Sequence, residues 1–264
     1  AGAILNFFNG VGQSLTLAST AGSLNLGAGT SGGAALGLEL GSTSNYDRIA
    51  TAGPAVVANK VLLNLTGLTG LQAGQYDLIT AQSGLSGGTF SIGNLATFGG
   101  FSFALNTSDT AVSLVTTALN PNLYWRVGSD VSWSSLNYAN YDTNFFTDAA
   151  GTTNAKGFPG LANKVIFSTT NSSATSYVTT LDGNFTVGSL QFTSNPTGIT
   201  SVVVAPGGPE AAALTIAPAS SADGITIDSN AGAITISAPL VLGASQTWNV
   251  ANTGANGSSL TLTG

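Results

Sequence analysis

Apolar residues alternate with polar or small residues along almost the whole chain, and this pattern constrains the fold more than any other feature. Leu36, Leu38 and Leu40 are separated by single residues, and so are Ile225 and Ile227 near the C-terminus. Successive side chains of a β-strand point to opposite faces, so this spacing predicts strands with one buried face. No apolar stripe of helical spacing runs for more than two turns. The chain is therefore predicted to be all-β, with short strands.

Two all-β architectures fit short strands separated by turn signals such as Asn9-Gly10 and Asp182-Gly183: stacked sandwiches or a parallel solenoid. Inward positions repeat Leu, Ile and Val, and outward positions repeat Thr, Ser and Asn. Strands also carry few charges, which would repel each other when stacked in register. We therefore predict a parallel β-helix, or solenoid. Residues 61–118 show no clean repeat and leave open an antiparallel, sandwich-like portion.

A change of composition at Asn120-Pro121-Asn122 divides the chain. Strand patterns precede it, whereas an aromatic stretch and an Asn- and Asp-rich segment follow it. The sequence predicts two β-rich modules, residues 1–120 and 121–264.

Composition excludes several functions. The 264 residues contain no His and no Cys, so imidazole bases, thiol nucleophiles and zinc–thiolate sites are ruled out. Only five Lys and Arg are present, and they are scattered, which argues against nucleic-acid binding. No apolar run approaches ~20 residues, so no transmembrane helix is predicted. The low charge favours an extracellular or cell-surface location. Because the chain begins with Ala1 and lacks Met, we expect a processed chain or part of a longer one.

A few carboxylates are candidates for chemistry. Asp142 with Asp148, or Asp223 with Asp228, offers the paired carboxylates that glycoside hydrolysis needs. Asp is also common in turns, and we favour that interpretation for all four residues. Asp223 and Asp228 are in addition weak candidates for a Ca²⁺ site. The sequence predicts no catalytic residue and no cofactor.

Aromatic residues near the start of the second module allow two interpretations. Exposed rings would form a glycan-binding or partner surface, because sugar rings stack on flat apolar faces. Alternatively, Trp125 and Trp133 cover the end of the solenoid core, as a β-helix requires. The candidates for the exposed surface are Trp133, Tyr138, Tyr141, Phe145 and Phe146.

Several segments resemble a known family. Tyr124-Trp125, the later Trp133, and residues 163–167 (NKVIF) and 185–192 (FTVGSLQF) resemble the opening of an autotransporter-associated β-strand repeat unit. Residues 36–49 resemble the stretch that ends such a unit. The resemblance implies a large bacterial surface or secreted protein, folded as a β-helix-like passenger without catalytic residues.

Both ends of the chain fall in strand patterns. A strand edge there leaves backbone N–H and C=O groups unpaired, and pairing with a neighbouring copy would satisfy them. The predicted interface residues are Ile4, Leu5, Phe7, Leu260 and Leu262.

The sequence therefore predicts a non-catalytic, extracellular structural protein. It would be the subunit of a self-assembling surface fibre, sheath or matrix, with its own copies as partners, joined head to tail by strand pairing. Two alternatives are an adhesin module that binds cell-surface glycans and a carbohydrate-active enzyme.

Overall fold

The computed structural model describes residues 4–27, 33–94, 98–126, 130–167, 176–193, 201–208, 212–219, 222–251 and 258–264. The chain is nearly all-β, with 53% strand and 1% helix, and its sheets form a parallel β-solenoid of about 8 turns. The predicted fold class is confirmed. No helix in the described ranges is long and apolar enough to cross a bilayer.

Two compact units make up the chain. Unit 1 comprises Ala1–Phe98 and Phe103–Ala118, and unit 2 comprises Gly99–Ser102 and Leu119–Gly264. The main division follows Ala118, close to the composition change at Asn120. The short segment Gly99–Ser102 departs from the sequence-based division, because Gly99 and Ser102 form bridges with residues 157–158 of unit 2.

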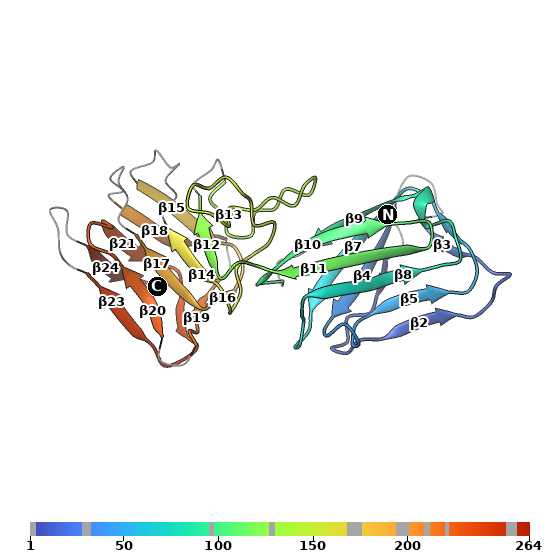
Figure 1. Ribbon diagram of the computed structural model, residues 1–264, viewed down its shortest axis with the longest axis horizontal. Coiled ribbons are helices and arrows are strands. Elements are labelled where there is room, and N and C mark those ends of the chain that lie inside the picture. The colour runs from blue at the N-terminus through green and yellow to red at the C-terminus, as the bar shows by residue number, and fades with distance from the viewer. Residues whose placement is uncertain are drawn as a thin grey trace. The chain divides into compact units, whose positions relative to one another are not determined.

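Unit 1 is built from stacked coils of parallel strands (Figure 1). The first two coils contain β1 (Ile4–Asn6), β2 (Ser14–Leu17), β3 (Leu24–Leu26), β4 (Ala34–Leu40), β5 (Arg48–Thr51) and β6 (Ala55–Val57). The remainder contains β7 (Lys60–Gly67), β8 (Gly74–Thr80), the 3₁₀ turn η1 (Leu85–Gly87), β9 (Thr89–Asn94), β10 (Phe101–Thr107) and β11 (Ala111–Ala118). Strand β11 pairs antiparallel with β8, so the parallel order ends there.

The core of unit 1 follows from the alternation of apolar residues. Leu36 and Leu38 of β4 pair in register with Leu63 and Leu65 of β7, and all four side chains are buried. The parallel register places like residues in columns that run from coil to coil. Burial of these columns supplies the main stabilising term of the fold.

Two buried carboxylates hold the first coil on the second. Glu39 Oε2 accepts hydrogen bonds from the N–H groups of Asn9 and Gly10, both at 2.8 Å. Asp47 accepts one from Gln13 N–H at 2.7 Å and one from Glu39 N–H at 2.8 Å. Burial raises the pKa of Asp47, and these N–H groups act in the opposite direction. The turn between β1 and β2 is thereby fixed to the coil beneath it.

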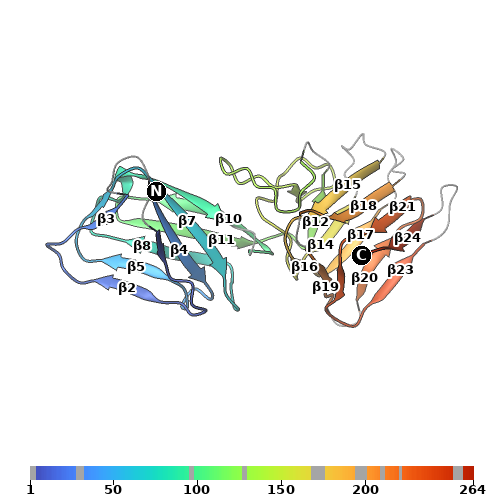
Figure 2. The same cartoon turned by 180° about the vertical axis from the view of Figure 1, so that it is seen from behind.

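Unit 2 is a second stack of coils with three parallel faces (Figure 2). The first face contains β12 (Asn122–Trp125), β14 (Lys164–Phe167), β17 (Ser189–Phe192), β20 (Asp223–Ile227) and β23 (Thr247–Val250). The second contains β15 (Ser176–Leu181), β18 (Ser201–Pro206), β21 (Ala233–Ile236) and β24 (Ser259–Leu262). The third contains β16 (Phe185–Val187), β19 (Leu214–Ile216) and β22 (Leu240–Leu242). The short β13 (Phe145–Phe146) pairs antiparallel with β12.

Inward side chains of unit 2 also stack in register. Trp125 pairs with Phe167, and Phe167 pairs with Phe192. The two phenylalanine rings are parallel, with centroids 4.7 Å apart and an interplanar angle of 7°. Stacked rings of this kind add to the stabilisation from buried area alone.

Candidate functional site

The last coil of unit 2 leaves its inward side chains partly uncovered. In β24, Leu262 is 45% exposed, although its register partner Ile236 in the coil below is buried. In β22, Leu242 is 58% exposed over the buried Ile216. In β23, Val250 is likewise exposed. Strands β22, β23 and β24 each lie at the edge of their sheet. Apolar side chains that the alternation directs inward thus face solvent at this end.

The first coil of unit 1 also leaves inward apolar side chains partly uncovered. Strands β1, β2 and β3 each lie at the edge of their sheet. Leu5 is 41% exposed over the buried Leu36, and Leu15 is half-buried over the buried Ile49. Phe7 is half-buried, and its N–H group donates to Gly37 O at 3.0 Å.

These two coils are defined here as the end coils: residues 4–27 in unit 1, and residues 237–251 with 258–264 in unit 2. The interface prediction named Ile4, Leu5, Phe7, Leu260 and Leu262, and the structure places all five on the end coils. The interface prediction did not include β2, β3, β22 or β23.

A signal for the end coils is present in the sequence. All Asp, Glu, Lys and Arg residues lie between Glu39 and Asp228, so residues 1–38 and 229–264 carry no charged side chain. Proteins commonly place charges, especially Lys, on strand edges to prevent pairing with other chains. That protection is missing from both end coils.

The opposite end of unit 2, by contrast, is covered by the chain itself. Residues 130–163, the capping segment, fold over the first coil of the unit. The N–H group of Trp133 donates to Thr180 O at 2.9 Å, and Thr180 N–H donates to Val131 O at 2.8 Å, which pairs the edge of β15. Strand β13 of the same segment pairs with β12. Residues 130–163 therefore cap one end of the unit, whereas the described residues place no strand over β22, β23 and β24.

The aromatic residues of the capping segment correct part of the glycan-surface prediction. Phe145 was a candidate for an exposed surface, and Trp133 was a candidate either for that surface or for the cap of the core, but both are fully buried. The Trp133 ring stacks on Trp125, with centroids 6.0 Å apart, and meets Phe145 edge-on at 5.5 Å. At the end of the solenoid core these rings pack against other apolar side chains, which removes their surface from water. The exposed-surface prediction is wrong for these two residues, and the burial of Trp133 agrees with the alternative interpretation, in which it covers the end of the core.

The three remaining aromatic residues of this prediction differ in their exposure to solvent. Tyr138 is 55% exposed, whereas Tyr141 and Phe146 are partly buried. The Arg126 guanidinium lies over the Phe146 ring, 5.4 Å from its centroid. A sugar ring would have to displace this cation to stack there.

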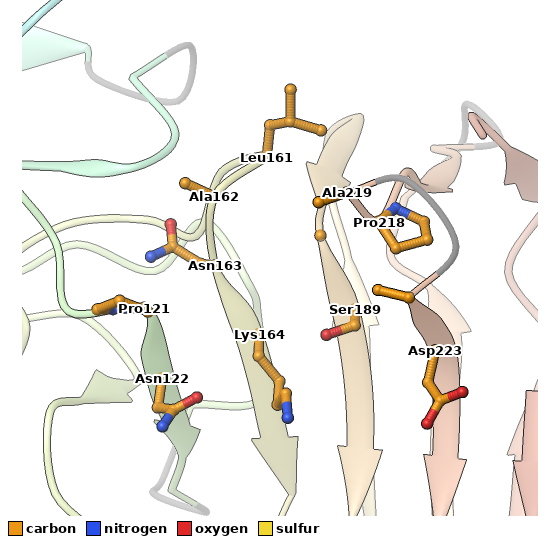
Figure 3. A pocket seen from close by; sticks show the side chains of 12 residues that line it. Pro121, Asn122, Leu161, Ala162, Asn163, Lys164, Ser189, Pro218, Ala219 and Asp223 are labelled. Atoms are coloured by element: carbon orange, nitrogen blue, oxygen red, sulfur yellow. The ribbon is translucent and has the colours of Figure 1, made fainter. Parts of the chain in front are cut away.

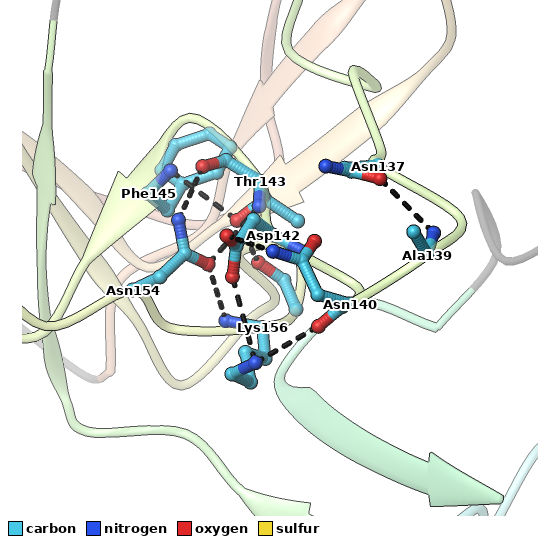
Figure 4. A network of polar contacts seen from close by, with 9 residues as sticks. Asn137, Ala139, Asn140, Asp142, Thr143, Phe145, Asn154 and Lys156 are labelled. Atoms are coloured by element: carbon cyan, nitrogen blue, oxygen red, sulfur yellow. Dashed lines mark hydrogen bonds and ion pairs between the residues drawn. The ribbon is translucent and has the colours of Figure 1, made fainter.

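Polar contacts fix the loop around these residues (Figure 4). Lys156 Nζ lies 3.5 Å from an Asp142 carboxylate oxygen and donates to Asn140 O at 2.8 Å. Asn154 donates to Thr143 O at 2.6 Å and accepts from Thr143 N–H at 3.0 Å. Asp142 therefore serves to hold the loop.

Asp148, the proposed partner of Asp142, is also a turn residue. Its carboxylate accepts hydrogen bonds from the N–H groups of Thr153 and Thr152, and these bonds lower its pKa. A general acid in glycoside hydrolysis requires the opposite shift. The turn interpretation describes this pair better than the catalytic one.

Asp223 and Asp228 do not form one metal site. They lie at opposite ends of β20, and a strand rises about 3.3 Å per residue, which places them about 16 Å apart. Ligands of one Ca²⁺ ion lie within 2.3–2.6 Å of it, so these two carboxylates do not share one ion. Among the described residues, no three Asp or Glu side chains gather around a common point.

A shallow hollow of about 280 Å³ runs along the start of the first face of unit 2 (Figure 3). Asn122, Lys164, Ser189 and Asp223 line it from neighbouring strands. Lys164 Nζ donates to Gln191 Oε1 at 3.5 Å. Asp223 carries the one carboxylate among the residues that line this hollow, so the hollow brings no pair of carboxylates together.

No protein-family model, no curated protein and no solved structure matches the chain. The resemblance to autotransporter-associated β-strand repeats therefore stays a prediction.

Proposed function

We propose that this chain is a non-catalytic structural protein of an extracellular fibre, sheath or surface matrix, whose copies join head to tail by β-strand pairing. The observation that carries the proposal is the pair of uncharged end coils, whose strands lie at sheet edges among the described residues. The edge strands are β1, β2 and β3 in unit 1 and β22, β23 and β24 in unit 2. The unit 1 end coil of one copy would pair with the unit 2 end coil of the next. Each joint would leave one end coil of each kind free for further copies.

The physical gain comes from completing two half-covered coils. Fully burying one Leu, Ile, Val or Phe side chain is worth about 1.5–3 kcal/mol. Half-exposed side chains on both partners would together contribute on the order of 10 kcal/mol, before new backbone hydrogen bonds are counted. Association costs about 4–15 kcal/mol in lost freedom of motion. Assembly is therefore expected to depend on protein concentration.

Composition is consistent with the extracellular setting. The chain has no Cys or Met that oxidants could modify, and five Lys and Arg residues leave few sites for trypsin-like proteases. The resemblance to bacterial surface repeats supports the same location.

A pair of matched variants tests the proposal. Leu262→Asp places a charge on the inward face of an end coil, whereas Val56→Asp places one on the outward face of β6. The two side chains are similarly exposed, at 45% and 48%, so both variants are expected to fold. Leu262→Asp should abolish assembly because the charge would be buried in the joint.

Light scattering and electron microscopy of the purified proteins provide the measurement. The unsubstituted chain and Val56→Asp should form filaments, and Leu262→Asp should remain monomeric. A monomeric unsubstituted chain at all accessible concentrations would overturn the proposal. So would filaments of Leu262→Asp equal to those of the unsubstituted chain.

A further inference from the structure

If copies stack through their end coils, the unit 1 coil of one copy can lie on the unit 2 coil of the next in three rotational positions. These positions differ in which strands become neighbours. The strands of the unit 1 coil follow one another as β1, β2 and β3. Those of the unit 2 coil follow as β22, β23 and β24, and the cycle then returns to the face of β22. Connections between parallel strands of one sheet are right-handed in about 98% of cases, so both coils wind in the same sense. Strand β2 can thus lie on β22, β23 or β24.

One rotation brings identical sequences together. Strand β2 reads Ser-Leu-Thr-Leu over residues 14–17, and β24 reads Ser-Leu-Thr-Leu over residues 259–262. In both strands the two leucines are directed inward over buried positions of the adjacent coil, and the threonine is exposed. The two strands therefore match residue by residue in both sequence and facing.

With β2 on β24, the columns of side chains that stack from coil to coil within each unit would continue across the joint. In unit 2, Thr235 pairs with Thr261, and Thr16 would be the next member of that outward column. On the inward side, Ile234 pairs with Leu260, and Leu15 pairs with Ile49. Stacking Leu15 on Leu260 joins these two columns into one.

A second pair of strands agrees with this rotation. It places β1 on β23, and the register that sets Leu5 on Trp248 also sets Asn6 on Asn249. Trp248 and Leu5 are both inward-facing, because each pairs with a buried residue of the adjacent coil. Stacked Asn side chains hydrogen-bond along a parallel ladder, and Thr–Thr pairs also stabilise neighbouring strands.

The other two rotations match less well at these outward positions. Placing β2 on β22 sets Thr16 on Val241, and placing β2 on β23 sets Thr16 on Asn249. With β2 on β22, one outward pair consists of identical residues, Asn25 on Asn249. With β2 on β23, no outward pair does. Only the β2–β24 rotation provides both a Thr–Thr and an Asn–Asn pair.

We infer that the joint between copies is a single-register parallel stack, with β2 of one copy on β24 of the next and Thr16 opposite Thr261. This inference rests on the proposed head-to-tail assembly and adds its register. The interaction surface is thus the two end coils, and the partner is a second copy of this chain.

Cysteine pairs test the register directly, because the chain contains no Cys of its own. Neighbouring strands lie ≈ 4.8 Å apart, within the Cα separation that a disulfide spans. Three double variants report the three rotations: Thr16→Cys with Thr261→Cys, Thr16→Cys with Asn249→Cys, and Thr16→Cys with Val241→Cys. Each is assembled under reducing conditions, oxidised mildly and separated on a non-reducing denaturing gel.

The Thr16/Thr261 pair should give a ladder of covalent oligomers, several-fold stronger than either other pair. Single-cysteine variants should stop at dimers. A stronger ladder from one of the other two pairs, or filaments without a dominant ladder, would overturn the register while leaving the assembly intact. Absence of both filaments and ladders would instead overturn the proposed function.

Discussion

At the scale of single residues, inward apolar side chains at equivalent positions of different coils differ in their exposure to solvent. Ile236 is buried, whereas its register partner Leu262 is 45% exposed. The difference lies in what covers each residue from the adjacent coil. Trp133 shows the reverse case, since a residue of an irregular segment is fully buried because it closes a core.

Truncating Trp133 tests its capping role. Trp133→Ala should lower the free energy of unfolding by about 3–5 kcal/mol, because it empties a site lined by Trp125, Phe167 and Phe185. Urea or guanidinium unfolding is the measurement. Tyr138→Ala, in the same segment but exposed, is the control and should change stability by less than about 0.5 kcal/mol. Equal losses from the two variants would contradict the capping role.

At the scale of elements, the capping segment decides which end of unit 2 is closed. It adds a short parallel pairing to β15 and an antiparallel one to β12. Asp182, which follows β15, fastens the segment. Its carboxylate accepts hydrogen bonds from Ser132 Oγ at 2.7 Å, from Ser134 N–H at 3.1 Å and from Ser134 Oγ.

The pKa of the Asp182 carboxyl determines how the stability of this attachment depends on pH. Burial acts to raise its pKa, but the hydrogen bonds from Ser134 and Ser132 outweigh burial, and the pKa lies below its ordinary value. A lowered pKa in the folded state gives stability that is present above the unfolded value of about 3.9. This stability is lost as pH falls through the folded value.

Asp182→Asn should therefore lower stability by about 1 kcal/mol at neutral pH, with the difference shrinking in strong acid. Urea unfolding at pH 7 and at about pH 2–3 measures both terms. Asp223→Asn removes the same charge at the exposed start of β20 and is the control. A difference between Asp182→Asn and the unsubstituted chain that grows on acidification would refute this account.

At the scale of the whole molecule, charge is confined to the interior of the sequence. Both end coils lack charged side chains, so a joint between them would form without ion pairs. The forces available to it are apolar burial and backbone hydrogen bonding. Neither is strongly screened by dissolved salt.

Assembly should accordingly respond little to ionic strength. Raising salt from about 0.01 M to 0.15 M shortens the screening length from about 30 Å to about 8 Å, which weakens any charge pairing. We expect nearly unchanged assembly by light scattering, and stronger assembly in sulfate, which favours apolar burial. Marked loss of assembly in 0.15 M sodium chloride would show that charge pairs hold the joint.

The sequence by itself determined the all-β class, the solenoid and the facing of most strand residues. These properties depend on the period of two in strand geometry, which is local and visible in segments such as Leu36–Leu40. The charge-free stretches 1–38 and 229–264 are also legible without coordinates, and they mark the two end coils.

Only the tertiary structure decided which apolar residues are covered. Burial of Trp133 and Phe145, exposure of Leu262, and the separation of Asp223 from Asp228 all depend on neighbours or distances that the residue types do not specify. In a solenoid the nearest neighbours lie one coil away, tens of residues along the chain. The path of the chain between coils therefore sets the environment of each residue, and that path is a property of the folded molecule.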